Sequence, residues 1–255
     1  MNQTVARVQE VSGVPVLVRE DRSLKMLATV RMARGDAQAH IVTYNPTKAP
    51  RPDYVIAFQC GFIIRIFSNP PEQRFDFAPS ASGRETVERL LEEVRGKLKL
   101  PAHVLQQLRD QLFDGLMVQL RSVPIGLRID AQIHREYREL ADLQRDAVLR
   151  QLQENQQSLA ADVRKIAPTN IFRASVTMNA AFAAFWARTF DDLSLTIPYR
   201  SAGFSQAGAD LLGLFDEIPD EPADDRALID AWADKLNLSD WYQWIPYGSG
   251  VAAGA

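Results

Sequence analysis

The sequence predicts an α+β protein in which a small N-terminal antiparallel sheet is followed by a mainly helical body. Short β-branched segments separated by turn residues occupy the first fifty residues. Beyond Gly83, apolar residues recur at the three- and four-residue spacing of amphipathic helices. We therefore expect three parts: residues 1–82, with the sheet; residues 83–247, a helical body packed on it; and residues 248–255, a disordered tail.

The expected strands occupy residues 13–20, 24–33 and 39–46. The connections between them are short and rich in turn residues, which predicts antiparallel hairpins. Three prolines within residues 45–52 end the sheet, because proline cannot donate a backbone hydrogen bond to a neighbouring strand. Residues 71–82 are expected to form a polar connector.

The most apolar stretch of the chain is PDYVIAFQCGFIIRIFSNPP, residues 52–71. It lacks the regular alternation of a strand, and prolines bracket it, so we interpret it as a buried helix with Asp53 near the positive end of the helix dipole. A buried hairpin that reverses at Cys60 is the alternative. The run is too short and too interrupted to cross a bilayer, which takes about 20 apolar residues. We expect the thiol of Cys60 to be buried and unreactive.

The remainder of the chain is expected to be a group of helices. Residues 170–190 are apolar most of the way round, which predicts a central helix covered by the others. The segment VPIGLRI, residues 123–129, is expected to break the helical pattern. The expected helices cover residues 84–100, 101–122, 130–163, 170–190, 203–217, 224–237 and, briefly, 239–244.

In a helix over residues 53–67, Phe58 and Phe62 lie on one face, one turn apart, with Gln59 beside them. This spacing, on an apolar helix that follows a compact sheet, resembles the zincin metallopeptidases. It is most similar to their anti-repressor branch, which is found in bacterial mobile elements and stress-response regulators. The resemblance covers residues 13–70.

The resemblance implies a fold without the family's chemistry. In zincins the helix carries H-E-x-x-H, in which two histidines bind zinc and the glutamate activates water. Here Phe58 and Phe62 stand at the histidine positions and Gln59 at the glutamate position. Phenylalanine has no lone pair for a metal, and glutamine cannot act as a base. The resemblance thus implies a pseudo-metallopeptidase kept for binding. An unrelated apolar core helix is the alternative.

Composition limits the classes of function. The net charge is −3, divided into 26 Lys/Arg against 20 Asp/Glu in residues 1–190 and 3 against 12 in residues 191–255. A near-neutral chain is not typical of a protein whose main partner is nucleic acid, although the basic first part keeps that alternative open. The three histidines do not lie at metal-ligand spacing, so we expect no metal, and no cofactor motif is present. One cysteine and no signal peptide predict a cytoplasmic protein.

Candidate binding residues remain. Four arginines lie among apolar neighbours: Arg65, Arg128, Arg173 and Arg200. A buried arginine needs a carboxylate or an anionic ligand, so their convergence on one cleft would indicate an anion-binding or catalytic pocket. Trp241 and Trp244 belong to an aromatic C-terminal cluster suited to binding a protein.

We therefore expect a non-catalytic binding or regulatory protein that acts on another protein. No catalytic residue is assigned, and no membrane association is expected. Two alternatives stay open: an enzyme with a dispersed anion-binding site built on the arginines, and a nucleic-acid-binding protein.

Overall fold

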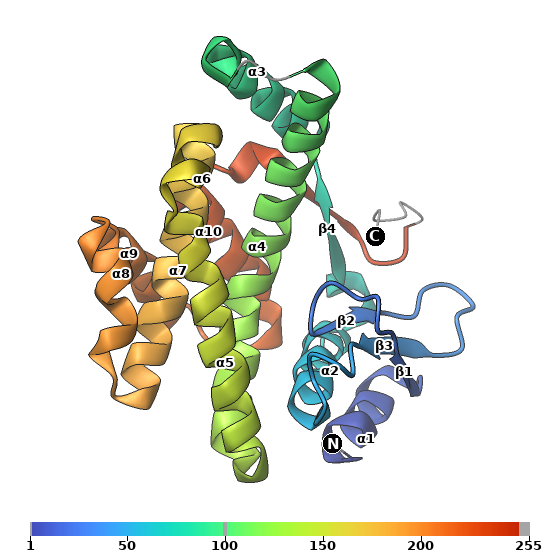
Figure 1. Cartoon of the computed structure of the whole chain (residues 1–255). Helices are drawn as coiled ribbons and strands as arrows, with labels where there is room; N and C mark the ends of the chain where they lie inside the picture. Colours follow the sequence, from blue (N-terminus) through green and yellow to red (C-terminus); the bar gives the residue numbers. More distant parts are fainter. Residues whose placement is uncertain (1, 99–100, 250–255) are drawn as a thin grey trace.

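The computed structural model describes residues 2–98 and 101–249 and shows an α+β protein that is mainly helical, with a small sheet near its N-terminus, as predicted. A long helix, α4 (Ala102–Glu136), runs through the centre of the molecule. The sheet and two helices lie on one side of α4, and most of the remaining helices lie on the other (Figure 1). The expected fold class is confirmed.

The N-terminal unit contains α1 (Asn2–Ser12), β1 (Val16–Glu20), β2 (Ala28–Arg31) and β3 (His40–Tyr44). The strand order is β1-β3-β2. β2 pairs antiparallel with β3 as expected, but β1 runs parallel to β3, and β1 and β2 are not neighbours. The predicted hairpin between the first two strands is therefore wrong. Connection length alone could not show that the third strand lies between them.

Helix α1 is not among the predicted elements. Its apolar residues Val5, Val8 and Val11 recur every three positions and pack in a small core with β3 and α2. Val8 is fully buried there. This spacing is helical, but the segment is short and contains few apolar residues. The strand-like segments that follow it therefore dominated the prediction for this part of the chain.

Helix α2 (Asp53–Phe67) confirms the helix predicted for the apolar stretch and excludes the hairpin. It is buried on two sides, because it packs on α1 and the sheet and also on α4. Gly61 permits the second contact: a Cβ there would lie 2.4 Å from Cγ2 of Ile129 in α4. Cys60 is buried as expected, and burial raises the pKa of its thiol to about 12, which leaves it unreactive.

The predicted break at residues 123–129 is wrong, because α4 continues through Pro124. An interior proline costs a helix about 3 kcal/mol. The side chains that follow it, Ile125, Leu127 and Ile129, are buried in the core. Burying each contributes about 1.5–3 kcal/mol, which outweighs the cost of the proline.

Three helices replace the single one expected over residues 130–163. α4 ends at Glu136, where Tyr137 leaves the helical conformation, and α5 (Ala141–Gln156) and α6 (Ala161–Ile166) follow. The other helices are α3 (Ala81–Leu98), α7 (Thr169–Phe190), α8 (Ile197–Ser201), α9 (Ser205–Glu217) and α10 (Asp225–Leu236).

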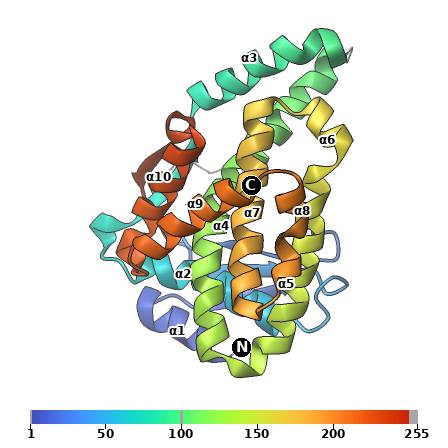
Figure 2. The same ribbon diagram turned by 90° about the vertical axis from the view of Figure 1, so that its left-hand side faces the viewer.

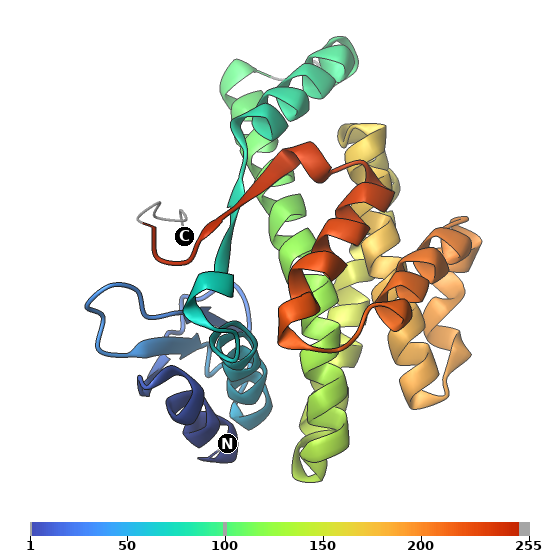
Figure 3. The same cartoon turned by 180° about the vertical axis from the view of Figure 1, so that it is seen from behind.

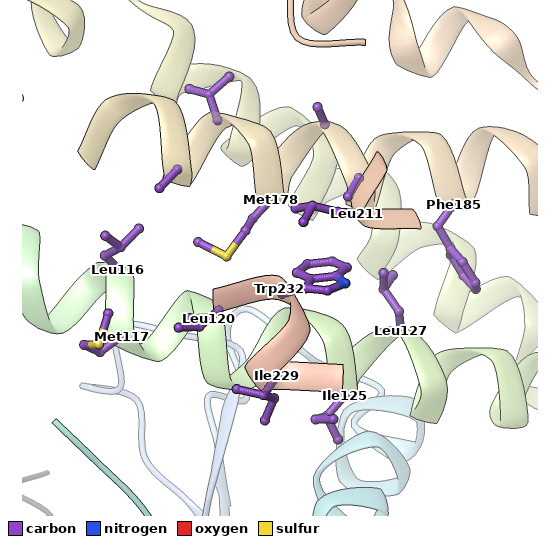
Figure 4. Packing of buried hydrophobic residues seen from close by; sticks show 14 of the residues in the cluster. Leu116, Met117, Leu120, Ile125, Leu127, Met178, Phe185, Leu211, Ile229 and Trp232 are labelled. Carbon is purple, nitrogen blue, oxygen red and sulfur yellow. The ribbon is translucent and has the colours of Figure 1, made fainter. Parts of the chain in front are cut away.

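The core of the helical body lies between α4, α7, α9 and α10. α7 is the central helix that the sequence predicts. Trp232 of α10 is fully buried and lies among Met178 of α7, Leu211 of α9 and Leu127 of α4 (Figure 4). Gly208 lets α9 approach α7 closely, since a Cβ there would lie 2.8 Å from the backbone of Ala180.

A second, two-stranded sheet joins distant parts of the chain. β4 (Phe75–Pro79) pairs antiparallel with β5 (Tyr242–Pro246), and the two form a ribbon (Figure 3). The polar connector expected at residues 71–82 and the helix expected at 239–244 are therefore wrong, although Ser239–Trp241 forms one 3₁₀ turn. Of the predicted tail, residues 248 and 249 form a turn after β5, and residues 250–255 lie outside the described residues.

Candidate functional site

The zincin-like positions on α2 are filled by a packed aromatic pair. The rings of Phe58 and Phe62 meet edge to face with their centroids 5.4 Å apart, and both are half-buried against the main core. Nε2 of Gln59 donates to the backbone oxygen of Ala28 at 3.4 Å. Within the described residues, no three His, Cys, Asp or Glu side chains gather closely enough to hold a metal ion. These residues perform packing between helices, and the ancestry of α2 stays a prediction.

Two of the predicted arginines converge. Arg65 of α2 and Arg128 of α4 are 5% and 0% exposed. Arg65 donates to both carboxylate oxygens of Asp225 through Nε and Nη2 at 2.7 Å each, and Nη1 of Arg128 donates to Oδ1 at 2.9 Å. Asp220 completes the group, with Oδ1 2.9 Å from Nη1 of Arg65. Two aspartates thus balance two arginines, and we call these four residues the arginine–aspartate cluster.

The arginine–aspartate cluster fastens the acidic segment 216–225 to the helices. Nη2 of Arg128 also donates to the backbone oxygens of Ile218 and Pro219, at 2.9 and 2.7 Å. The positive charges already have partners from the chain itself, so the cluster has little capacity for an external anion. Its role is to hold α2, α4 and the start of α10 together.

Two other candidates do not belong to a site. Arg200 is exposed on α8, does not line the pocket described below, and makes no side-chain hydrogen bond or ion pair to any described residue. Trp244 of β5 donates from Nε1 to Oδ1 of Asp230 at 2.7 Å, and the hydroxyl of Tyr242 donates to the same oxygen. Trp244 therefore ties the β4–β5 ribbon to α10.

The last two candidates, Arg173 and Trp241, lie at one pocket. The pocket has a volume of about 500 Å³ and is bounded by α3, α7, α9, the end of α10 and the turn after α10. Figure 2 shows α3 crossing above α7 and α10, which form the other main walls. We call it the α3–α7–α10 pocket.

Two backbone features shape this pocket. Asn237 adopts a left-handed conformation with φ 58°, ends α10, and turns the chain so that Trp241 faces α3. At Gly83 a Cβ would lie 2.9 Å from Cα of Trp241 and 2.7 Å from the ring of Phe113, so only glycine allows α3 to start this close. Trp241 in turn stacks on Phe113, with centroids 6.0 Å apart.

The charges of the pocket have one sign. Arg89 of α3, Arg173 of α7 and Lys235 of α10 line it, and none of the described lining residues is an aspartate or glutamate. Lys235 has a partner outside the lining, Asp210, at 3.0 Å. Arg89 approaches Glu93 only to 3.9 Å, in an exposed pair, and Arg173 makes no hydrogen bond or ion pair to any described residue.

The rest of the lining combines hydrogen-bonding groups with an apolar wall. Thr177, one turn beyond Arg173 on α7, is only 6% exposed, yet its hydroxyl has no hydrogen-bond partner among the described residues. Leu90, Leu236 and Trp241 supply apolar surface. The first turn of α7 brings the positive end of a helix dipole and the last turn of α10 brings a negative end, so these dipoles oppose each other and the side chains decide the potential.

Sequence reasoning found this pocket only in part. Arg173 stood out because its neighbours are apolar, and Trp241 because it belongs to an aromatic cluster. Arg89 and Lys235 lie on ordinary amphipathic helices among many other charges, so no local signal distinguishes them. Only the packing of three helices brings them together.

A buried carboxyl group was also missed. Asp130 of α4 is 3% exposed and accepts hydrogen bonds from the hydroxyl of Tyr54 at 2.7 Å and from Nε2 of Gln144 at 3.0 Å. Burial raises the pKa of Asp130 to about 7, although the two hydrogen bonds lower it. The group joins α2, α4 and α5, and no cation among the described residues pairs with Asp130 to balance an ionised carboxylate.

The chain matches no protein-family model, no curated protein and no solved structure. In the described part of the chain, the helices are all too short or too polar to cross a membrane. The function is therefore inferred from the geometry and the charges of the α3–α7–α10 pocket.

Proposed function

We propose that the protein is a non-catalytic binding protein that holds a small anion in the α3–α7–α10 pocket. One observation carries this proposal: cations from three different helices line the pocket without a carboxylate, in a chain whose net charge is negative. The three cations are exposed, so water screens part of their mutual repulsion, and an anion held among them removes more of it. The arginine–aspartate cluster shows that this chain supplies acids where it needs to balance arginines internally.

The size and chemistry of the pocket support the same function. A volume of about 500 Å³ lies within the usual range of roughly 300–1,000 Å³ for small-ligand sites. The described lining contains no Asp, Glu, His or Cys, the side chains that most often act as general acid, base or nucleophile. Its arginines, threonines and asparagines are suited to holding a ligand.

The residues of α2 agree with a role in binding. If the zincin resemblance reflects ancestry, Phe58, Gln59 and Phe62 describe a pseudo-metallopeptidase whose catalytic helix became a packing element. We accordingly place the protein among regulatory proteins of the cytoplasm. Elemental analysis of the purified chain tests this part, and stoichiometric zinc held near residues 58–62 would contradict it.

A charge-matched pair of variants tests the anion site. Arg173→Gln removes a pocket cation, whereas Arg200→Gln removes an exposed arginine that also lacks a described partner. Isothermal titration with phenyl phosphate, phenyl sulfate and phthalate should detect binding of at least one anion to the wild type. We expect Arg173→Gln to weaken that binding about tenfold or more, and Arg200→Gln to leave it unchanged. Equal affinities of the two variants, or no binding by any anion, would refute the proposal.

A further inference from the structure

We propose that the ligand of the α3–α7–α10 pocket is a small organic molecule that carries a dianionic phosphate monoester. This inference rests on the proposed anion-binding function and specifies the chemistry of the anion. Three features of the pocket support it: the number of unbalanced charges, the number of free donors and the apolar wall beside them.

The unbalanced charge corresponds to two negative charges. Arg173 has no partner among the described residues, and the pair between Arg89 and Glu93 is long and exposed, whereas Lys235 already contacts Asp210. In the arginine–aspartate cluster of the same molecule, two arginines take two carboxylates. Arg173, together with Arg89 if the ligand replaces its long, exposed pair with Glu93, fits a ligand with two negative charges. A phosphate monoester carries about −1.5 to −2 at pH 7.

The free donors exceed what one carboxylate can accept. Each guanidinium offers a planar fork that fits two phosphate oxygens, and the ammonium of Lys235, which contacts Asp210, has further N–H donors on a third wall. Thr177, a residue of the lining that is only 6% exposed, adds a hydroxyl without a described partner one turn from Arg173. A phosphate monoester presents three terminal oxygens as acceptors, so it can engage donors that approach from several walls.

The apolar wall requires an organic group on the phosphate. Leu90, Leu236 and Trp241 contribute carbon surface beside the charged groups, from α3, α10 and the turn after α10. Inorganic phosphate would leave this surface in contact with water. An ester whose organic part covers it gains from burial of apolar area, and we expect such an ester to bind more tightly than inorganic phosphate.

Titration calorimetry at pH 8 and constant ionic strength compares four probes: phenyl phosphate, phenyl sulfate, phthalate and inorganic phosphate. Phenyl sulfate has the shape of phenyl phosphate but one negative charge, and phthalate has two charges on two carboxylates. We expect phenyl phosphate to bind at least tenfold more tightly than each of the other three. An equal or tighter affinity for phenyl sulfate or for phthalate would overturn the phosphate assignment.

Measurements at a second pH and on a second variant test whether the pocket recognises the phosphate group itself. The second pKa of a phosphate monoester is near 6, so lowering the pH from 8 to 5 should weaken phenyl phosphate towards the affinity of phenyl sulfate, whose charge does not change. Thr177→Val keeps the shape of the side chain and removes its hydroxyl. It should weaken phenyl phosphate about tenfold, because a hydrogen bond to a charged group is lost. An unchanged affinity in Thr177→Val, or no loss at pH 5, would count against the assignment.

The outcomes separate this inference from the proposed function. If all anions bind with similar affinity, and Arg173→Gln weakens each of them, the pocket is a general anion site and only the phosphate assignment fails. If none of the probes binds, both fail.

Discussion

Arg65 and Arg128 lie at the junction of α2, α4 and α10, whereas Arg89 and Arg173 lie at the pocket between α3 and α7. The first pair is buried and receives two aspartates from a distant part of the chain. The second pair is exposed and lines a pocket whose described lining contains no acid; Arg89 has only a long pair with Glu93, and Arg173 has no ion pair to a described residue. In one molecule, arginine thus fastens elements together at one place and, under the proposed function, binds an external anion at another. The two pairs of arginines differ in the source of the negative charge that balances each guanidinium group.

The largest effect should come from breaking the balanced pair. Asp225→Asn removes the carboxylate shared by Arg65 and Arg128 and leaves two buried positive charges with one aspartate. We expect the free energy of unfolding to fall by about 3–5 kcal/mol, the usual cost of an uncompensated buried charge. Urea denaturation measures it. A loss below about 1 kcal/mol would mean that water already balances these arginines.

Asp130 allows the same comparison for a negative charge, because it is a buried acid with no described cation to balance it. The pKa of Asp130 is raised from 3.8 to about 7, so its contribution to stability is complete below pH 4 and is lost as the pH rises through about 7. Asp130→Asn removes this dependence. We expect the stability of the variant relative to the wild type to increase by roughly 2–4 kcal/mol between pH 4 and pH 8.

Denaturation curves at the two pH values give that difference. Nδ1 of His134 lies 3.3 Å from Oε1 of Gln144, the same amide that donates to Asp130. If the wild type and Asp130→Asn change in parallel with pH, Asp130 is not the group responsible.

The smallest effect is expected at the pocket. Without ligand, Arg173→Gln should change the free energy of unfolding by no more than about 0.5 kcal/mol, because the exposed guanidinium makes no described contact. Thermal denaturation in a buffer free of multivalent anions measures it. A loss above 1 kcal/mol would show that Arg173 supports the fold and would remove the contrast with Arg65.

Local patterns predicted the long, strongly apolar helices but missed α1 and several helix boundaries, and they predicted long-range strand pairings poorly. α2 and α7 were predicted because their apolar residues are dense and continuous along one segment. The parallel pairing of β1 and the β4–β5 ribbon depend on segments that meet only in the folded chain. The alternation of Phe75, Asp76 and Phe77 is typical of a strand, but the neighbouring sequence does not indicate that this strand pairs with β5.

The candidate site was predictable to the same extent. The sequence grouped Arg65 and Arg128 with Arg173 and Arg200, but the structure buries only the first two, and the sequence could not name the aspartates of α10 and the preceding loop that pair with them. The sequence also did not indicate that Arg173 and Lys235 line the same pocket, because their helices lie far apart in the chain. The helix break predicted near Pro124 was wrong for a related reason. The free-energy cost of an interior proline can be read from the local sequence, whereas the burial of the side chains that follow it, which outweighs this cost, depends on tertiary packing.

The β4–β5 ribbon has a consequence for the newborn protein. β5 completes a sheet with β4, and the hydroxyl of Tyr247 just beyond it donates to the backbone of Ala33 in the N-terminal unit. Most of the helical body is translated between these two halves of the ribbon. Once residue 79 has been synthesised, the edge of β4 that pairs with β5 therefore lacks its partner until residues 242–246 have also been synthesised. The pairing of β4 therefore waits for β5, and a chain interrupted before residue 242 would leave the β4 edge open to other segments able to pair with it.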